Sequence, residues 1–350
     1  MIISNLIEKI EVFGLNKKNN KEFLKNIKKI LFHHYKNCTE IKNFFKKQDV
    51  NLNKVNKIEN LPFIPVKIFK KLDLKSIENK KVFKILRSSG TSGDFSKIYL
   101  DKFNSLNQTK VLSKIMTFFF GKERLPMMIL DSRKIFSNRS EFSARAAAFL
   151  GFSFMGKDHT FLLDDDLSFN LERYQDFKKK YHNKKFLIFG LTNLVWEKFL
   201  NNNKIEKEDF SKCLLLHGGG WKKLEKLNIS NNDFKKELFK KFKLRAIHNY
   251  YGMVEQTGSI FIECSNCGSF VTSNYSDIII RGKKLESLEP NNVGYIQLLS
   301  LVPTSYPGNS ILTDDLGVII KKDCSCKKLG KQFLLKGRIL NSEVRGCSNV

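Results

Sequence analysis

The chain of 350 residues has no apolar run approaching the roughly 20 residues that a membrane-spanning helix requires. Its start, Met1-Ile2-Ile3-Ser4 followed by Glu8 and Glu11, has no basic segment leading into an apolar stretch, so we expect no secretory signal. No internal repeat and no signature of RNA or DNA binding is found. These absences favour a cytoplasmic protein with neither a membrane span nor a nucleic-acid partner.

Acidic residues are few: 35 Asp and Glu stand against 62 Lys and Arg, which gives a net charge of +27. The lysines are spread along the whole chain and are accompanied by many asparagines, which is typical of a compositional bias rather than of a nucleic-acid patch. A basic surface of this kind would attract an acidic carrier protein or an anionic substrate.

The seven cysteines of a cytoplasmic chain should be thiols or metal ligands and not disulfides. Two close pairs, C-x-x-C and C-x-C, match the spacing of a structural tetrahedral Zn²⁺ site, and unpaired thiols are the alternative. The four sulfurs would come from Cys264, Cys267, Cys324 and Cys326. The isolated Cys38 and Cys213 are expected to lie in the core.

Six consecutive small residues form the most informative segment: Ser88, Ser89, Gly90, Thr91, Ser92 and Gly93. Such residues bury little apolar surface, but their backbone N–H groups and hydroxyls can enclose an anion, as a nucleotide phosphate requires. A Walker A loop is excluded because Phe95 stands where its second glycine belongs, and the dinucleotide fingerprint is excluded because Gly90 and Gly93 are three apart. From these residues alone, a flexible surface loop remains the alternative.

Helical spacing dominates residues 1–60, strands are predicted on both sides of the small-residue loop, and strands alternate with helices between residues 127 and 251. That alternation predicts a layered α/β fold with a mostly parallel sheet. Short strands and turns follow residue 258. We therefore expect a helical N-terminal region (1–80), an α/β core (81–258) and a β-rich subdomain with a C-terminal tail (259–350).

Three further segments have the character of ligand-binding turns at strand ends. An apolar strand ends in Gly218, Gly219 and Gly220 before Trp221. A second strand ends in the stretch 249–255, and a turn at 313–317 offers two carboxylates shortly before Gly337-Arg338. Ligands bind at the carboxyl ends of parallel strands. Each segment alone could be an ordinary turn.

Taken together, these segments resemble the adenylate-forming superfamily, which has a T-S-G-T-T-G-type loop, a Gly-Gly segment, Y-G-x-T-E, a T-G-D turn and a G-R pair in this order. A closer resemblance, carried by residues 251–258, 305–308 and 343–347, is to the acyl-protein synthetases of bacterial luminescence. It implies the large N-terminal adenylation domain, with layered sheets and a small β-rich subdomain. Since the chain ends twelve residues after Arg338, we expect no C-terminal lid.

The resemblance also implies roles for individual residues. The loop from Ser88 to Gly93 would hold the ATP phosphates, and Glu255 would help to hold Mg²⁺, a cation that prefers oxygen ligands. The nucleoside would be bound by Asn249, Tyr251, Gly252, Asp315 and Arg338, with Asn249 bonded to adenine, Tyr251 stacked on it and Asp315 bonded to the ribose. Gly218, Gly219, Gly220 and Trp221 would line the acyl pocket, where absent side chains leave room.

Two positions bear on the chemistry. Val254 stands where the superfamily has a phosphate-contacting threonine, for which Thr257 is a candidate replacement. Cys347, beside Arg345, matches the cysteine that accepts the acyl group in the luminescence family, and a nearby arginine favours the thiolate. A terminal thiol without a role is the alternative. His217 and His248 are assigned no role.

The first functional hypothesis is an ATP-dependent ligase that converts a carboxylic acid, most naturally a long-chain fatty acid, to acyl-AMP and transfers the acyl group to Cys347. A ligase that uses CoA or a carrier protein is the second, and a weakly catalytic scaffold for an acyl reductase is the third. The expected partners are therefore the acid and either an acyl reductase or an acyl carrier protein.

Overall fold

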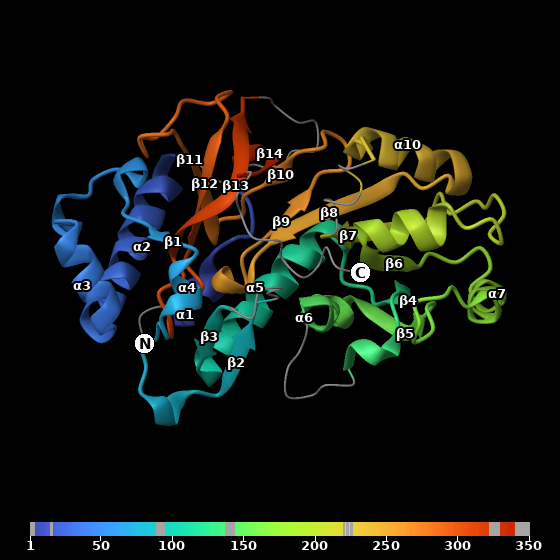
Figure 1. The fold of residues 1–350 in the computed structure, drawn as a ribbon, viewed down its shortest axis with the longest axis horizontal. Coiled ribbons are helices and arrows are strands. Elements are labelled where there is room, and N and C mark those ends of the chain that lie inside the picture. The colour runs from blue at the N-terminus through green and yellow to red at the C-terminus, as the bar shows by residue number, and fades with distance from the viewer. Residues whose placement is uncertain are drawn as a thin grey trace. The chain divides into compact units, whose positions relative to one another are not determined.

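The computed structural model describes most of the chain, and Figure 1 shows the course of its helices and strands. The described residues are 4–14, 17–88, 95–136, 144–219, 221, 224, 227–321 and 330–339. They fall into two compact units. The first unit takes its described residues from 4–88, 95–119 and 252–339, and the second from 120–251.

An antiparallel sheet forms the centre of the first unit, and its strands follow one another in the order β11-β12-β13-β14-β10-β9. Strand β1 adds to β13 in parallel. The strands are β1 (Ile64–Pro65), β9 (Ile260–Glu263), β10 (Phe270–Val271), β11 (Ser276–Arg281), β12 (Gly294–Ser300), β13 (Ser310–Ile320) and β14 (Gln332–Arg338).

A separate antiparallel pair in the first unit is formed by the two strands that flank the small-residue loop in the sequence. It consists of β2 (Lys84–Arg87) and β3 (Lys97–Leu100), which pair in the register Arg87↔Lys97. The helices of this unit are α1 (Ser4–Lys9), α2 (Lys17–Asn37), α3 (Thr39–Lys47), α4 (Ile68–Lys71) and α5 (Lys102–Phe120), with short 3₁₀ turns η1 (Leu52–Lys54), η2 (Ile58–Asn60), η3 (Asn79–Lys81) and η7 (Val254–Gln256).

All strand pairs of the second unit's sheet are parallel, in the order β8-β7-β6-β4-β5. The strands are β4 (Leu125–Leu130), β5 (Gly156–Phe161), β6 (Leu187–Leu191), β7 (Leu214–Gly218) and β8 (Ala246–Gly252). The run Leu125–Leu130 is buried at every position, as expected of a strand that is covered on both faces. The mostly parallel sheet that the sequence predicts for this region is therefore confirmed.

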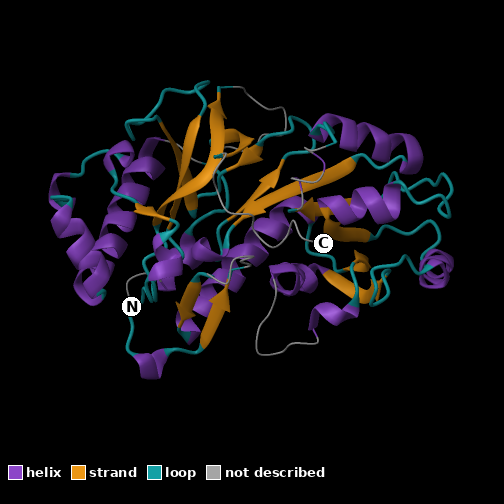
Figure 2. Ribbon diagram, in the orientation of Figure 1, coloured by secondary structure: helices purple, strands orange, loops and turns teal. Residues whose placement is uncertain are grey.

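Helices alternate with these strands along the chain (Figure 2). They are α6 (Ala144–Phe152), α7 (Leu171–Lys180), α8 (Thr192–Leu194), the π-helical turn η6 (Val195–Leu200) and α10 (Asn231–Phe242), with the 3₁₀ turns η4 (Arg133–Phe136) and η5 (Ser153–Met155). Helix α10 begins at a capping box, in which Ser230 and Asp233 each satisfy the other's backbone N–H group.

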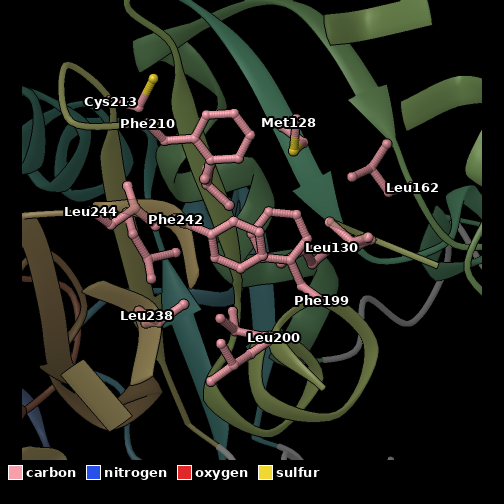
Figure 3. Close-up of a cluster of buried hydrophobic side chains, with 14 of the residues drawn as sticks. Met128, Leu130, Leu162, Phe199, Leu200, Phe210, Cys213, Leu238, Phe242 and Leu244 are labelled. Atoms are coloured by element: carbon pink, nitrogen blue, oxygen red, sulfur yellow. The ribbon is translucent and has the colours of Figure 1, made fainter. Parts of the chain in front are cut away.

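One face of the parallel sheet packs against α7, η6 and α10 in a large apolar cluster, part of which Figure 3 shows. Strand residues such as Met128 and Leu215 meet Phe199 and Phe242, whose rings stack with centroids 4.4 Å apart. The opposite face carries the ring of Phe152 from α6, 4.8 Å from that of Tyr250 on β8. This packing fixes the strand ends at which the candidate site residues lie.

The segment 313–317, which the sequence analysis interprets as a turn, lies inside strand β13. The pairing of β13 with β14 shifts register between Asp315 and Gly317. An irregularity within a strand, rather than a turn, therefore presents the two carboxylates. The predicted division at residues 80 and 258 stays a prediction.

Candidate active site

Hydrogen bonds between Ser88 and Ser96 close the base of the small-residue loop. The Ser96 N–H donates to Ser88 Oγ at 2.8 Å, and the Ser88 N–H donates to the Ser96 carbonyl at 3.1 Å. Strands β2 and β3 hold both residues at the end of their ladder. Ser89, Gly90, Thr91, Ser92 and Gly93 lie outside the described residues, so their phosphate-binding role stays a prediction.

The Glu255 carboxylate is buried, with 3% of the residue exposed, and accepts a hydrogen bond at 2.7 Å from the fully buried Ser96 hydroxyl. No Lys, Arg or His in the described part of the chain forms an ion pair with it. A buried carboxylate without a cationic partner is unfavourable unless a cation joins it.

Residues 306–308 hold the backbone around Glu255 in place. The Tyr306 hydroxyl accepts a hydrogen bond from the Thr257 N–H at 3.0 Å, and the Gln256 side-chain amide donates to the Gly308 carbonyl at 3.0 Å. A Cβ atom on Gly308 would lie 2.6 Å from the Glu255 carbonyl oxygen, so only glycine fits there. Burial raises the pKa of Tyr306, which stays a neutral hydrogen-bonding group.

Thr257, the candidate replacement for the threonine absent at Val254, has its hydroxyl 3.0 Å from the Tyr306 hydroxyl. Both groups are buried. The Thr257 side chain therefore packs within the first unit and fastens the segment after Glu255.

Asp315 and Arg338 face each other across the register pair of β13 and β14. Arg338 Nε donates to Asp315 Oδ1 at 2.7 Å, and the Asp315 N–H donates to the Thr313 hydroxyl at 3.1 Å. The neighbouring Asp314 lies 3.9 Å from Lys67 Nζ in a more exposed pair. Two residues that the resemblance assigns to the ribose thus form one ion pair.

At the end of β7, the ring of Tyr250 fills the space beside Gly218. A Cβ atom on Gly218 would lie only 2.7–2.8 Å from atoms of that ring. The Tyr250 ring therefore occupies the position that a side chain at residue 218 would take, and an acyl pocket lined by Gly218, Gly219, Gly220 and Trp221 stays a prediction. The Gly219 carbonyl accepts the Thr192 N–H at 3.2 Å, and Gly220 lies outside the described residues.

His217 and Trp221 lie on the face of the sheet that packs against α7, η6 and α10. The His217 ring is 4.7 Å from that of Phe234 and 5.9 Å from that of Trp221, and its Nδ1 lies 2.9 Å from the Thr192 hydroxyl. Burial holds the pKa of His217 well below its usual value, so the ring is neutral. These contacts give His217 a packing role.

Asn249 and Tyr251 are two residues apart on β8, so their side chains leave the same face of the strand. Asn249 is 6% exposed and pairs in register with His217, while Tyr251 is half-buried. Gly252 ends the strand, and Met253 separates it from η7. A common face is what an amide and a ring would need in order to bind one base.

Cys264 and Cys267 lie in the turn between β9 and β10, where the Gly268 N–H donates to the Cys264 carbonyl at 2.8 Å. Cys267 Sγ lies 3.7 Å from Gln332 Oε1 at the start of β14. No group of three or more potential metal ligands among His, Cys, Asp and Glu is found within the described residues. Cys324, Cys326 and Cys347 lie outside them.

Ser96 and Tyr306, which orient Glu255 and its backbone, are missed by the sequence analysis. Tyr306 belongs to the stretch 305–308 that carries the family resemblance, so its motif was the available signal. Ser96 has no comparable signal, because its partner lies 159 positions away in the chain.

The fold matches solved structures of ligases. A 2-hydroxyisobutyryl-CoA ligase bound to 2-HIB-AMP and CoA gives a TM-score of 0.71 at 12% identity, over 95% of this chain and 77% of that chain. ATP-bound MatB from Rhodopseudomonas palustris gives 0.50 at 14% identity, over 75% of this chain and 49% of that chain. The protein thus has the fold of the adenylate-forming enzymes.

Within that class, the chain belongs to the LuxE acyl-protein synthetase family, whose pattern it matches over residues 2–350. A long-chain-fatty-acid–luciferin-component ligase from Aliivibrio fischeri is 23% identical over 310 residues, which is 84% of this chain and 78% of the relative. The protein is accordingly an ATP-dependent ligase. None of the helices described here is long and apolar enough to cross a membrane.

Proposed function

We propose that the protein activates a long-chain fatty acid with ATP to give acyl-AMP, and then transfers the acyl group to the Cys347 thiol. The observation that carries the proposal is the Glu255 carboxylate, which is buried, oriented by Ser96 and free of a cationic side chain among the described residues. Family membership supports the same reaction.

The surroundings of Glu255 fit a magnesium ion. Mg²⁺ is commonly held by one or two carboxylates together with substrate phosphates, and it needs no cage of protein ligands. Glu255 would hold it on the protein side, where the bound cation would neutralise phosphate charge. The buried carboxylate would then have a counter-charge, which no side chain in the described part of the chain supplies.

The nucleotide would be bound by residues from several strand ends. The loop Ser88–Gly93 would hold the phosphates through N–H groups and hydroxyls. Asn249 and Tyr251 would bind adenine from one face of β8, and Asp315, oriented by Arg338, would accept hydrogen bonds from the ribose hydroxyls. These residue roles are proposals supported by the contacts above.

In the first step, an oxygen of the fatty acid carboxylate attacks the α-phosphorus of ATP, and pyrophosphate leaves. In the second step, the Cys347 thiolate attacks the acyl carbonyl carbon, forming a thioester while AMP leaves with the bonding electron pair. Positioning of the carboxylate and stabilisation of phosphate charge would provide most of the rate acceleration.

A downstream protein would consume the thioester, and we propose an acyl reductase for this role. The Aliivibrio fischeri relative is named for joining a long-chain fatty acid to a luciferin component. The net charge of +27 favours an acidic partner surface, and an acyl carrier protein remains the alternative acceptor. The cytoplasmic location stays a prediction.

We also propose a structural Zn²⁺ bound by Cys264, Cys267, Cys324 and Cys326. In its support, the Cys264–Cys267 turn approaches the start of β14, and the other two cysteines belong to the connection between β13 and β14. Four thiolates satisfy the tetrahedral preference of zinc.

Acid-dependent release of pyrophosphate tests the adenylation step. The wild-type protein is incubated with ATP, Mg²⁺ and a panel of fatty acids of different lengths, and with CoA or a carrier protein in parallel reactions. We expect release with long-chain acids, a strong loss in Glu255→Gln and no loss in the exposed control Glu289→Gln. If no acid causes pyrophosphate release, the proposal is refuted. If a thioester forms only on added CoA or carrier protein, that molecule and not Cys347 is the acyl acceptor.

A further inference from the structure

Ser96 uses its backbone and its side chain for two different contacts. Its N–H and carbonyl groups bond to Ser88, which begins the small-residue loop. Its hydroxyl donates to Glu255 Oε1 at 2.7 Å. Both residues are buried, with Ser96 0% and Glu255 3% exposed, so this hydrogen bond is shielded from solvent. One residue therefore joins the loop base to the carboxylate.

The backbone of Glu255 is fixed independently of Ser96. The Gln256 amide donates to the Leu298 and Gly308 carbonyls, and the Thr257 N–H donates to Tyr306. What these contacts leave undetermined is the rotation of the terminal carboxylate, because the last torsion of a glutamate has a broad, roughly two-fold profile. The Ser96 hydroxyl is the described contact that selects one orientation.

The orientation of a carboxylate affects how well it can bind a magnesium ion. An ionised carboxylate offers about four lone-pair sites on its two oxygens. Ser96 occupies one of them on Oε1, and the others remain directed away from that hydroxyl. Mg²⁺ requires near-ideal octahedral geometry, so a freely rotating carboxylate would bind it less tightly than an oriented one.

We propose that Ser96 is a positioning residue that orients Glu255 for the divalent cation and connects this cation ligand to Ser88, where the small-residue loop begins. The inference rests on the proposed function, because it takes Glu255 as a cation ligand. Ser96 would act through its hydrogen bond to Glu255 and not as a ligand of the cation or the nucleotide.

The substitution Ser96→Ala separates the two contacts of this residue. It removes the hydroxyl that orients Glu255 but keeps the N–H and carbonyl groups that bond to Ser88. We expect the Mg²⁺ concentration at half-maximal pyrophosphate release to rise about tenfold, as the loss of one hydrogen bond to a charged group predicts. Ser96→Thr retains a hydroxyl and should recover most of the wild-type Mg²⁺ dependence.

A second readout does not depend on turnover. Electron paramagnetic resonance of Mn²⁺ with a non-hydrolysable ATP analogue measures the fraction of cation bound, and it should show the same weakening in Ser96→Ala. Ser276→Ala is the matched control, because it removes an equally buried hydroxyl whose partner is Ser273 and not Glu255. Thermal melting of each variant measures how much stability the lost hydroxyl contributes.

The outcomes distinguish the inference from the function on which it rests. Weaker cation binding in Ser96→Ala but not in Ser276→Ala supports the inference. Wild-type cation dependence in a folded Ser96→Ala protein overturns it while the proposed function stands. If the wild-type protein binds no Mn²⁺ together with the nucleotide and releases no pyrophosphate, both are overturned.

Discussion

Arg338 Nε donates to Asp315 Oδ1 at 2.7 Å, between residues that are also paired in the register of β13 and β14. The pair is largely withdrawn from solvent, since the Asp315 and Arg338 side chains are 9% and 31% exposed. An ion pair at this depth holds the carboxylate in one orientation, whereas the nearby Lys67–Asp314 pair, with Lys67 58% exposed, is expected to contribute little.

Arg338→Ala should therefore raise the KM for ATP by about tenfold, because the Asp315 carboxylate, which we propose binds the ribose, loses its orientation. Lys67→Ala should leave the KM nearly unchanged. Steady-state pyrophosphate release at varied ATP concentration measures both. Equal shifts in the two variants would contradict a specific role for the Asp315–Arg338 pair.

Cys347→Ser should abolish covalent labelling of the protein by a radiolabelled fatty acid while acid-dependent pyrophosphate release continues. The reason is that adenylation precedes thiol attack and does not need the acceptor. Cys213→Ala is the control, since burial raises the pKa of the Cys213 thiol to about 11 and keeps it protonated and unreactive. If Cys347→Ser is labelled at the wild-type level, the acyl group is accepted by a residue other than Cys347.

Purified protein should contain about one equivalent of zinc, as a four-thiolate structural site predicts. Cys267→Ser should lose the metal and unfold at a lower temperature, whereas Cys38→Ser should retain it, because Cys38 is an isolated buried thiol. Elemental analysis after extensive dialysis measures the content. A metal-free wild-type protein that folds normally would rule the zinc site out.

Gly218→Ala should destabilise the protein by about 1–3 kcal/mol, since the added methyl group overlaps the Tyr250 ring in a packed region. Tyr250→Leu should compensate when it is combined with Gly218→Ala, because it vacates the same space. Urea unfolding of the two single variants and the double variant gives the coupling energy. Strict additivity would show that the two positions do not share a volume.

The stability of the protein should depend on pH through His34, whose Nδ1 lies 2.7 Å from the Ser76 hydroxyl. Burial lowers the pKa of His34 from 6.5 to about 3 in the folded state. The unfolded chain therefore binds a proton that the folded chain does not, and the free energy of unfolding falls as the pH decreases from 6.5 towards 3.

In His34→Gln this contribution of the histidine is absent. Between pH 6.5 and 3, the slope of the free energy of unfolding against pH should therefore be smaller by up to about 1.4 kcal/mol per pH unit. Chemical denaturation at several pH values compares the two proteins. Identical slopes would mean that His34 titrates similarly in the folded and unfolded chains.

Much of the fold could be predicted from local patterns. The helical spacing within residues 1–60 predicted helices there, and α2 buries Phe23, Ile27, Ile30 and Leu31 on one side. The strands predicted on both sides of the small-residue loop are found as β2 and β3. These elements were predictable because neighbours in the sequence determine their periodicity.

Other features depend on contacts between distant segments and leave no local pattern. Strand β1 has only two residues, one of them a proline, and exists because it pairs with β13. The acidic stretch around Asp315 resembles a turn, yet sheet pairing makes it part of a strand. In the candidate site, the hydrogen bond between Ser96 and Glu255 depends on the folded arrangement rather than on either local motif.

The Tyr250 ring over Gly218 also has an evolutionary consequence. Neither residue can change in size without affecting the other, although they lie on different strands, β7 and β8. Among related chains we expect covariation at these two positions: glycine accompanied by an aromatic ring, and alanine or serine accompanied by a smaller side chain. The glycine at position 218 would then be conserved because of its packing against the neighbouring strand, in addition to any requirement of substrate binding.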